Sequence, residues 1–146
     1  IETIYQISQD LLISLGGSYT DAELAEDAPT IGGASGDRLP SSPDYNVNLG
    51  LQYEFELAGH ASYISGDYAY VSEFYNKLGE TGFALGDYGQ LNVSAGIALN
   101  NFNVELFAHN LTNEDALTHA DTIFVADDRA YQLRPRTIGV NVGYQF

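Results

Sequence analysis

Hydrophobic and polar residues alternate one by one along much of this chain. The clearest example is residues 45–57, where apolar side chains occupy every odd position and Asn, Gly, Gln or Glu occupies every even position. Successive side chains of a β-strand point to opposite faces, so a period of two predicts a strand with one apolar and one polar face. The end of the chain follows the same pattern, with apolar residues at Ile138, Val140, Val142, Tyr144 and Phe146.

Five further stretches show this pattern and raise the expected number of strands to about seven. They cover residues 1–8, 11–20, 60–71, 90–99 and 102–110. Phe107 interrupts the alternation in the last of these stretches. No stretch has the 3.6-residue period of an amphipathic helix. The sequence therefore predicts an all-β fold made of antiparallel strands.

Connections of two lengths alternate between the predicted strands. Tight hairpin turns are predicted at Gln9–Asp10, Ala58–Gly59 and Asn100–Asn101. Long polar loops are predicted at residues 21–44, 74–87 and 113–131. Short turns at one end and long loops at the other are typical of outer-membrane β-barrels, whose strands need about 9–11 residues to cross the bilayer.

A soluble β-sandwich is the main alternative, because alternation alone fits both folds. The polar face, however, consists of Asn, Ser, Gly, Gln and Glu, which cannot form a dry core, so lipid or a second sheet must cover the apolar face. Aromatic residues also gather near the predicted strand ends, as the ring girdles of membrane barrels do. They are Tyr19 and Tyr45 at the long-loop end, and Tyr53, Phe55, Phe102, Tyr144 and Phe146 at the short-turn end.

The small polar residues of one face also indicate the size of the barrel. Barrels of eight strands fill their interior with bulky side chains, whereas barrels of about 22 strands leave a wide lumen. An odd number of strands leaves two open edges, which cannot face lipid unpaired. The chain is therefore expected to be a transmembrane segment of about seven strands within a larger barrel of about 22.

Composition and charge narrow the function. The 146 residues carry a net charge of −15 with only five Lys and Arg, so a nucleic-acid partner is not expected, because phosphates would be repelled. The absence of cysteine excludes a disulfide framework and thiolate chemistry. No apolar run reaches the roughly 20 residues of a membrane helix. Since Ile1 opens directly into strand-like sequence without a signal peptide, the chain is expected to be a fragment, or its export signal to be missing.

Several stretches together resemble the C-terminal portion of TonB-dependent outer-membrane receptors. The most specific combination is NLTN at residues 110–113, then a loop, PRTIG at 135–139 and a terminal phenylalanine. The matching stretches are GSYTDAEL (17–24), GDRLPSSPDYNVNLGLQY (36–53), LGDYGQLNVSAG (85–96), FNVELFAHNLTNE (102–114) and LRPRTIGVNVGYQF (133–146). They cover nearly the whole chain outside the loops.

The resemblance implies a barrel of about 22 strands with an N-terminal plug, in the outer membrane of a Gram-negative bacterium. Such receptors take up scarce nutrients, most often ferric siderophores, with energy relayed by TonB. Residues 1–146 would be the C-terminal part of the barrel, without the plug or the TonB-binding segment, so transport belongs to the parent protein. Sugar, cobalamin and metal chelates all remain open as substrates. The alternative is an outer-membrane adhesin or structural barrel without transport, which the sequence upstream of this chain would distinguish.

The resemblance also implies a role for the last strand. In outer-membrane proteins a terminal aromatic strand is recognised by the barrel-assembly machinery, and Tyr144 and Phe146 match that signal. Anchoring of Phe146 in the membrane interface is compatible with this role.

Candidate chemistry is sparse, and neither an enzyme nor a cofactor is expected. The three histidines are too far apart for a zinc site, and no serine, histidine and acid occur in a nucleophile-elbow context. His109 is expected to point inward, either as a contact in the lumen or as a hydrogen-bonded wall residue. His119, with Asp121, Asp127 and Asp128, either holds a cation such as calcium or forms part of a solvated loop.

Acidic residues are concentrated in the long loops, which are expected to repel an anionic ferric chelate. Capture of such a chelate would then lie elsewhere in the barrel or at an isolated base such as Arg129. Alternatively, the loop acids bind lipopolysaccharide phosphates through divalent cations, in which case chelating calcium and magnesium would release the lipopolysaccharide. Arg134 and Arg136 would contact those phosphates directly or pair with acids on a neighbouring strand.

Overall fold

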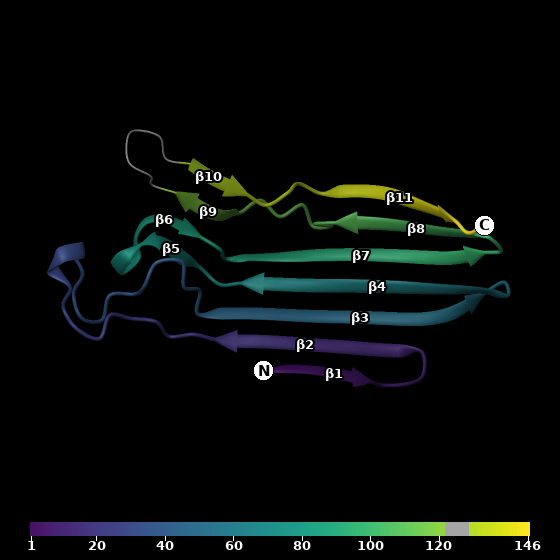
Figure 1. Ribbon diagram of the computed structural model, residues 1–146, viewed down its shortest axis with the longest axis horizontal. Coiled ribbons are helices and arrows are strands. Elements are labelled where there is room, and N and C mark those ends of the chain that lie inside the picture. The colour runs from purple at the N-terminus through teal and green to yellow at the C-terminus, as the bar shows by residue number, and fades with distance from the viewer. Residues whose placement is uncertain (122–128) are drawn as a thin grey trace.

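The computed structural model describes residues 1–121 and 129–146. Its main element is one antiparallel sheet of seven strands, which confirms the predicted all-β fold (Figure 1). Strands of the sheet that follow one another along the chain also lie side by side in it, because the four remaining strands form two separate hairpins. In spatial order the strands are β1 (Glu2–Gln6), β2 (Leu11–Tyr19), β3 (Tyr45–Leu57), β4 (His60–Val71), β7 (Tyr88–Leu99), β8 (Phe102–His109) and β11 (Thr137–Tyr144).

The short turns and the long connections lie at opposite ends of the sheet, as predicted (Figure 1). Leu57 pairs with His60 around a two-residue turn in which Ala58 and Gly59 both have positive φ, as tight hairpins require. Leu99 pairs with Phe102 around a turn of the same length. The first turn is longer than the predicted Gln9–Asp10. β1 ends at Gln6, and the Ile7 N–H donates to the Leu11 carbonyl at 2.9 Å.

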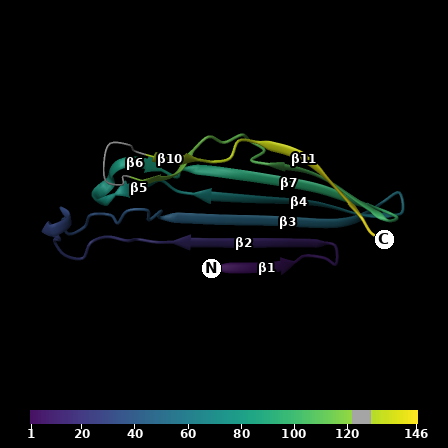
Figure 2. The same ribbon diagram turned by 45° about the horizontal axis from the view of Figure 1, so that its top comes forward.

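The long connections contain more structure than the predicted polar loops. Two short hairpins form there, made of β5 (Phe74–Lys77) with β6 (Thr81–Leu85) and β9 (Leu117–Asp121) with β10 (Arg129–Gln132). Single 3-10 turns form at Pro29–Ile31 and Leu78–Glu80. A view turned by 45° shows the hairpins beyond the long-loop end of the sheet (Figure 2). None of the helical segments among the described residues is long and apolar enough to cross a membrane.

The register places apolar residues on one face of the sheet and polar residues on the other. Directly paired residues of antiparallel strands share a face, so each row of partners can be followed across the sheet. One such row runs through Ile13, Leu51, Gly66, Val93, Ala108 and Ile138, and it defines the apolar face. The adjacent row runs through Leu12, Gln52, Ser65, Ser94, Phe107 and Gly139, and it defines the polar face.

No second sheet covers the apolar face in the described part of the chain. Leu49 is 46% exposed, Val140 59% and Val142 64%. The buried apolar residues among those described are only Phe74, Leu85, Ala108 and Ala120, and three of the four lie in the long-loop hairpins. The β-sandwich alternative is therefore wrong for this part of the chain, because a sandwich buries one face of each sheet against the other.

Every acidic residue of the seven strands lies on the polar face, and these strands contain no Lys or Arg. The registers assign five acids to this face: Glu2, Glu54, Glu56, Asp67 and Glu105. An ionised carboxylate is costly to remove from water unless it is paired. The polar face must therefore meet water or a polar partner.

The strands are staggered with respect to the rows that cross them. β2 extends six residues from Ile13 to Tyr19 toward the long-loop end, but only two, to Leu11, toward the short-turn end. β11 shows the reverse, extending one residue from Ile138 toward the long-loop end and six toward the short-turn end. A progressive shift of this kind accompanies the strand tilt of barrel walls.

Aromatic side chains pair at both ends of the apolar face, where ring girdles were predicted. Tyr19 and Tyr45 have ring centroids 5.2 Å apart at the long-loop end. At the short-turn end, Tyr144 lies 4.9 Å from Phe102 and 5.1 Å from Phe146. Such rings suit a boundary between an apolar medium and water.

Two of the aromatic residues on the polar face, Tyr63 and Phe107, each lie over a glycine of the next strand. A Cβ atom on Gly96 would lie 2.2 Å from a ring carbon of Tyr63, and one on Gly139 would lie 2.5 Å from the Phe107 ring. The missing side chains let both rings lie flat against the wall. Phe107, which breaks the sequence alternation, is accommodated in this way.

We predict that Gly96→Ala destabilises the protein by about 1–3 kcal/mol, because the added methyl group displaces the Tyr63 ring. The midpoint of urea unfolding in detergent micelles measures this change. Gly16→Ala is the matched control on the same face, since its Cβ atom would meet nothing closer than 3.8 Å, and it should shift stability by less than about 0.5 kcal/mol. Equal effects of the two variants would contradict the packing described here.

Candidate functional site

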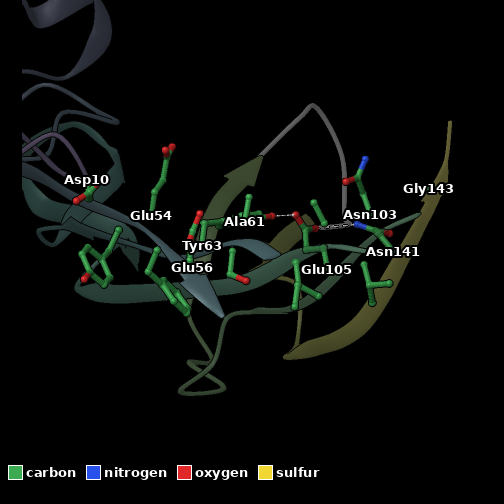
Figure 3. Close-up of a pocket in the computed structure, with 15 residues that line it drawn as sticks. Asp10, Glu54, Glu56, Ala61, Tyr63, Asn103, Glu105, Asn141 and Gly143 are labelled. Atoms are coloured by element: carbon green, nitrogen blue, oxygen red, sulfur yellow. Dashed lines mark hydrogen bonds between the residues drawn. The ribbon is translucent and has the colours of Figure 1, made fainter. Parts of the chain in front are cut away.

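A hollow of about 900 Å³ lies on the polar face near the short-turn end of the sheet (Figure 3). Residues of β3, β4, β7, β8 and β11 line it, together with Asp10 from the first turn. Its polar lining includes Glu54, Glu56, Tyr63, Glu105 and Asn141. Because three of these five side chains are acidic and none is basic, the hollow would attract cations or hydrogen-bond donors.

Glu105 of β8 is held in place by side chains from two other strands, β4 and β11. The Tyr63 hydroxyl donates to one carboxylate oxygen, and the Asn141 amide donates to the other at 2.9 Å (Figure 3). Tyr63 reaches Glu105 across β7 because Gly96 lies beneath its ring. The arrangement fixes an anion and braces three strands, and it pairs no nucleophile with a base.

Further hydrogen bonds connect side chains along the middle of the polar face. Ser65 and Ser94 share a hydrogen bond of 2.8 Å between β4 and β7. One step closer to the long loops, the Asn92 amide donates to Asp67 at 2.7 Å. The polar face is therefore a connected surface of small polar groups, as expected for a wall that faces water.

At the long-loop end, Arg38 joins the first long loop to the β5–β6 hairpin. Its guanidinium pairs with Asp44 and, at 3.0 Å, with Glu80. The hydrogen bond to Glu80 is the largest of the effects that raise the pKa of Arg38 above its ordinary value. Backbone bonds reinforce the contact, because the Gly79 N–H donates to the Arg38 carbonyl at 3.1 Å and the Ser41 N–H to the Tyr75 carbonyl at 2.8 Å.

The β5–β6 and β9–β10 hairpins share a small apolar core. Phe74, Leu85 and Ala120 are its buried members, and Leu117 packs against them. The Asn76 amide also donates to the Ala120 carbonyl at 3.2 Å. The three long connections are therefore joined to one another.

The four residues that the sequence marked as candidate contacts come from three different segments of the chain. His109 lies on the polar face as predicted, and the centroid of its ring lies 4.9 Å from that of the Phe107 ring. Arg129 begins β10, whereas Arg134 and Arg136 lie between β10 and β11. Arg136 donates to the Leu111 carbonyl at 3.4 Å. A role for these four residues in binding ligand or lipopolysaccharide stays a prediction.

The predicted cation site is only partly covered by the structure. The His119 ring nitrogen lies 2.7 Å from a carboxylate oxygen of Asp121, so these two residues form a pair. Asp127 and Asp128 lie outside the described residues. Within residues 1–121 and 129–146, no three His, Asp or Glu side chains are grouped so that they could hold a metal ion.

Sequence reasoning missed the bracing of Glu105 and the pairing of Arg38. Both depend on partners far along the chain, since Tyr63 precedes Glu105 by 42 residues and Arg38 precedes Glu80 by the same separation. The glycines paired with Tyr63 and Phe107 could have indicated how these rings pack once the register was known. A large side chain often packs over a glycine at the paired position of the adjacent strand.

The family model for the TonB dependent receptor-like β-barrel matches residues 2–113. Among solved structures, the chain is similar to BauA, the ferric preacinetobactin receptor from Acinetobacter baumannii, with a TM-score of 0.76 and 21% identity over 98% of this chain and 21% of that one. It is also similar to FyuA, the ferric yersiniabactin uptake receptor from Yersinia pestis, with a TM-score of 0.75 and 20% identity over 97% of this chain and 22% of that one. No curated protein matches the chain in sequence. The chain spans about a fifth of the length of each matched receptor, and the likeness shows a shared fold.

Proposed function

Because this chain belongs to the TonB-dependent receptor-like β-barrel family, we propose that it forms part of the wall and outer loops of an active-transport receptor in the outer membrane of a Gram-negative bacterium. The uncovered apolar face is the observation that carries this proposal. Burying one Val, Leu or Ile side chain stabilises a protein by about 1.5–3 kcal/mol relative to leaving it in water. A face with many such residues therefore needs lipid or another apolar cover.

Within the parent protein, we propose that the chain is the C-terminal part of the barrel. The outer edges of β1 and β11 pair with no strand among the described residues. Unpaired backbone groups are not tolerated in lipid, so the remaining strands of the parent barrel would pair with these edges. The plug and the TonB-binding segment would likewise belong to the parent.

The proposed substrate is a ferric siderophore or a similarly scarce nutrient. The two matched structures are receptors for ferric preacinetobactin and ferric yersiniabactin, which supports an iron chelate as the class. The net charge of −15 disfavours capture of an anionic chelate by this sector. We therefore place capture of such a chelate on other parts of the barrel, while this sector supplies the wall.

We predict that deleting the parent gene abolishes uptake of radiolabelled iron from the cognate ferric chelate under iron limitation. Inactivating TonB in the wild-type strain should abolish the same uptake, because transport against a gradient needs an energy source. A plasmid carrying the whole parent gene should restore uptake only when TonB is present. Unchanged uptake in the deletion strain, with altered adhesion or envelope integrity, would instead support an adhesin or a structural barrel.

We further propose that Tyr144 and Phe146 act as a signal for the barrel-assembly machinery. Tyr144 belongs to the apolar face, and the Phe146 ring meets the Tyr144 ring edge to face with centroids 5.1 Å apart. Phe146 lies beyond the end of β11 and stays exposed despite this ring contact, so its side chain adds little burial to the sheet.

We predict that Phe146→Ala slows assembly of the parent receptor severalfold in cells, because the assembly machinery loses an aromatic contact. Pulse-labelling, followed by the heat-dependent shift of the folded barrel on gels, measures this rate. Gln145→Ala is the matched control on the opposite face and should assemble at the wild-type rate. If Phe146→Ala assembles at the wild-type rate, the side chain is not an assembly signal. The same conclusion follows if the purified variant is destabilised enough to explain the slower assembly.

A further inference from the structure

Asn110 is the feature from which a further role can be derived. It follows β8 directly, and its side chain is only 1% exposed. Its φ angle is +50°, a left-handed conformation that asparagine tolerates better than most residues. A buried amide is costly unless its donors and acceptor are used, so the partners of Asn110 reveal what it holds together.

The side chain of Asn110 closes the base of the third long loop. Its Nδ2 donates to the carbonyls of Glu114 and Arg134, both at 2.9 Å, and its Oδ1 accepts from the Glu114 N–H at 2.8 Å. Glu114 lies where the chain leaves toward β9, and Arg134 lies where it returns toward β11. We call Asn110, Glu114 and Arg134 the loop base.

The backbone of Asn110 connects this loop base to the polar face. Its N–H donates to Oδ1 of Asn92 on β7 at 2.9 Å. The Nδ2 of the same Asn92 donates to Asp67 on β4 at 2.7 Å. Asp67 and Asn92 are direct partners in the register, and Asp67 is exposed on the polar face. A continuous chain of hydrogen bonds therefore runs from an exposed carboxylate to the loop base.

The direction of these bonds makes Asp67 an orienting group. A carboxylate accepts hydrogen bonds and donates none, so Asp67 and the Asn110 N–H select the same orientation of Asn92, with the NH₂ group toward β4 and the carbonyl oxygen toward Asn110. The opposite orientation would place two donors, the Asn92 NH₂ and the Asn110 N–H, against each other. Any lumen group that engages Asp67 in place of Asn92 removes one of the hydrogen bonds that hold Asn92 in this orientation and weakens the hold on Asn110.

We infer that Asp67, Asn92 and Asn110 form a relay that couples the polar face of the wall to the base of the third long loop. The inference rests on the proposed function, in which the polar face lines the lumen and the long loops lie outside the cell. Asp67 and Asn92 are positioning residues in this relay, and Asn110 is the residue that holds the loop. Occupation of the lumen near Asp67 thereby changes how firmly the loop is closed at its base.

The test compares backbone hydrogen exchange in variants of the whole parent receptor in lipid nanodiscs. Asn110→Gly keeps the left-handed backbone accessible and removes three side-chain hydrogen bonds, so peptides covering residues 112–118 should exchange about tenfold faster or more. Asp67→Ala should accelerate exchange of the same peptides about two- to fivefold although it touches none of them. Asp67→Asn, which keeps a carbonyl acceptor, should restore most of the protection.

Ser65→Ala is the matched control, because it removes a hydrogen bond of 2.8 Å between the same two strands outside the relay. It should leave exchange of residues 112–118 unchanged. The double variant Asp67→Ala/Asn110→Gly should exchange residues 112–118 no faster than Asn110→Gly alone, because both substitutions act through one connection. If Asp67→Ala and Asn92→Ala leave the loop base protected while Asn110→Gly does not, Asn110 is a local brace and the relay is refuted. Equal effects of Ser65→Ala and Asp67→Ala would refute it as well.

These measurements need no substrate and no TonB, so the relay and the transport proposal fail independently. Loss of the heat-dependent gel shift identifies a variant that has not folded. If Asp67→Ala does not fold, Asn92→Ala replaces it in the double variant with Asn110→Gly, and an additive effect of the two substitutions on exchange would contradict the relay.

Discussion

The separation of apolar and charged side chains onto opposite faces of one sheet layer is the constraint on which the rest of this structure depends. The apolar face has no protein cover among the described residues, and the polar face carries all five strand acids without a Lys or Arg. A one-residue slip of any strand would exchange its two sets of side chains, so the register is strongly specified. Only surroundings that are apolar on one side and aqueous on the other satisfy both faces. A barrel with lipid outside and a water-filled lumen inside provides them.

This constraint accounts for details of the wall and of the loops. Inside, the Tyr63 and Phe107 rings lie flat over glycines, and hydrogen bonds between side chains brace neighbouring strands. Outside, the chain leaves the apolar medium, and ordinary burial becomes possible again. The small core of Phe74, Leu85 and Ala120 forms there, and Arg38 finds two acidic partners. The loops are thus organised by burial and ion pairing as in soluble proteins, whereas the strands leave their apolar face exposed.

The sequence predicted the seven strands, their two faces and two of the three tight turns, because each is encoded by neighbouring residues. It did not predict the hairpins in the long connections. Phe74 and Leu85 gain burial only when the hairpin containing Leu117 and Ala120 packs against them, and that contact spans a large separation in the chain. The bracing of Glu105 and the closure of the loop base by Asn110 were missed for the same reason. Resemblance drew attention to the NLTN stretch, but only the structure shows what its first asparagine holds.

The most direct test of the central claim is the environment of alternate residues along β3 in the parent receptor within its membrane. Spin labels placed one at a time at residues 46–52 report collisions with oxygen, which concentrates in lipid, and with a water-soluble nickel chelate. A period of two is predicted, with labels at Val47, Leu49 and Leu51 relaxed by oxygen and labels at Asn48, Gly50 and Gln52 relaxed by nickel. Low accessibility to both reagents at the apolar positions would show that protein covers this face, and it would contradict the account.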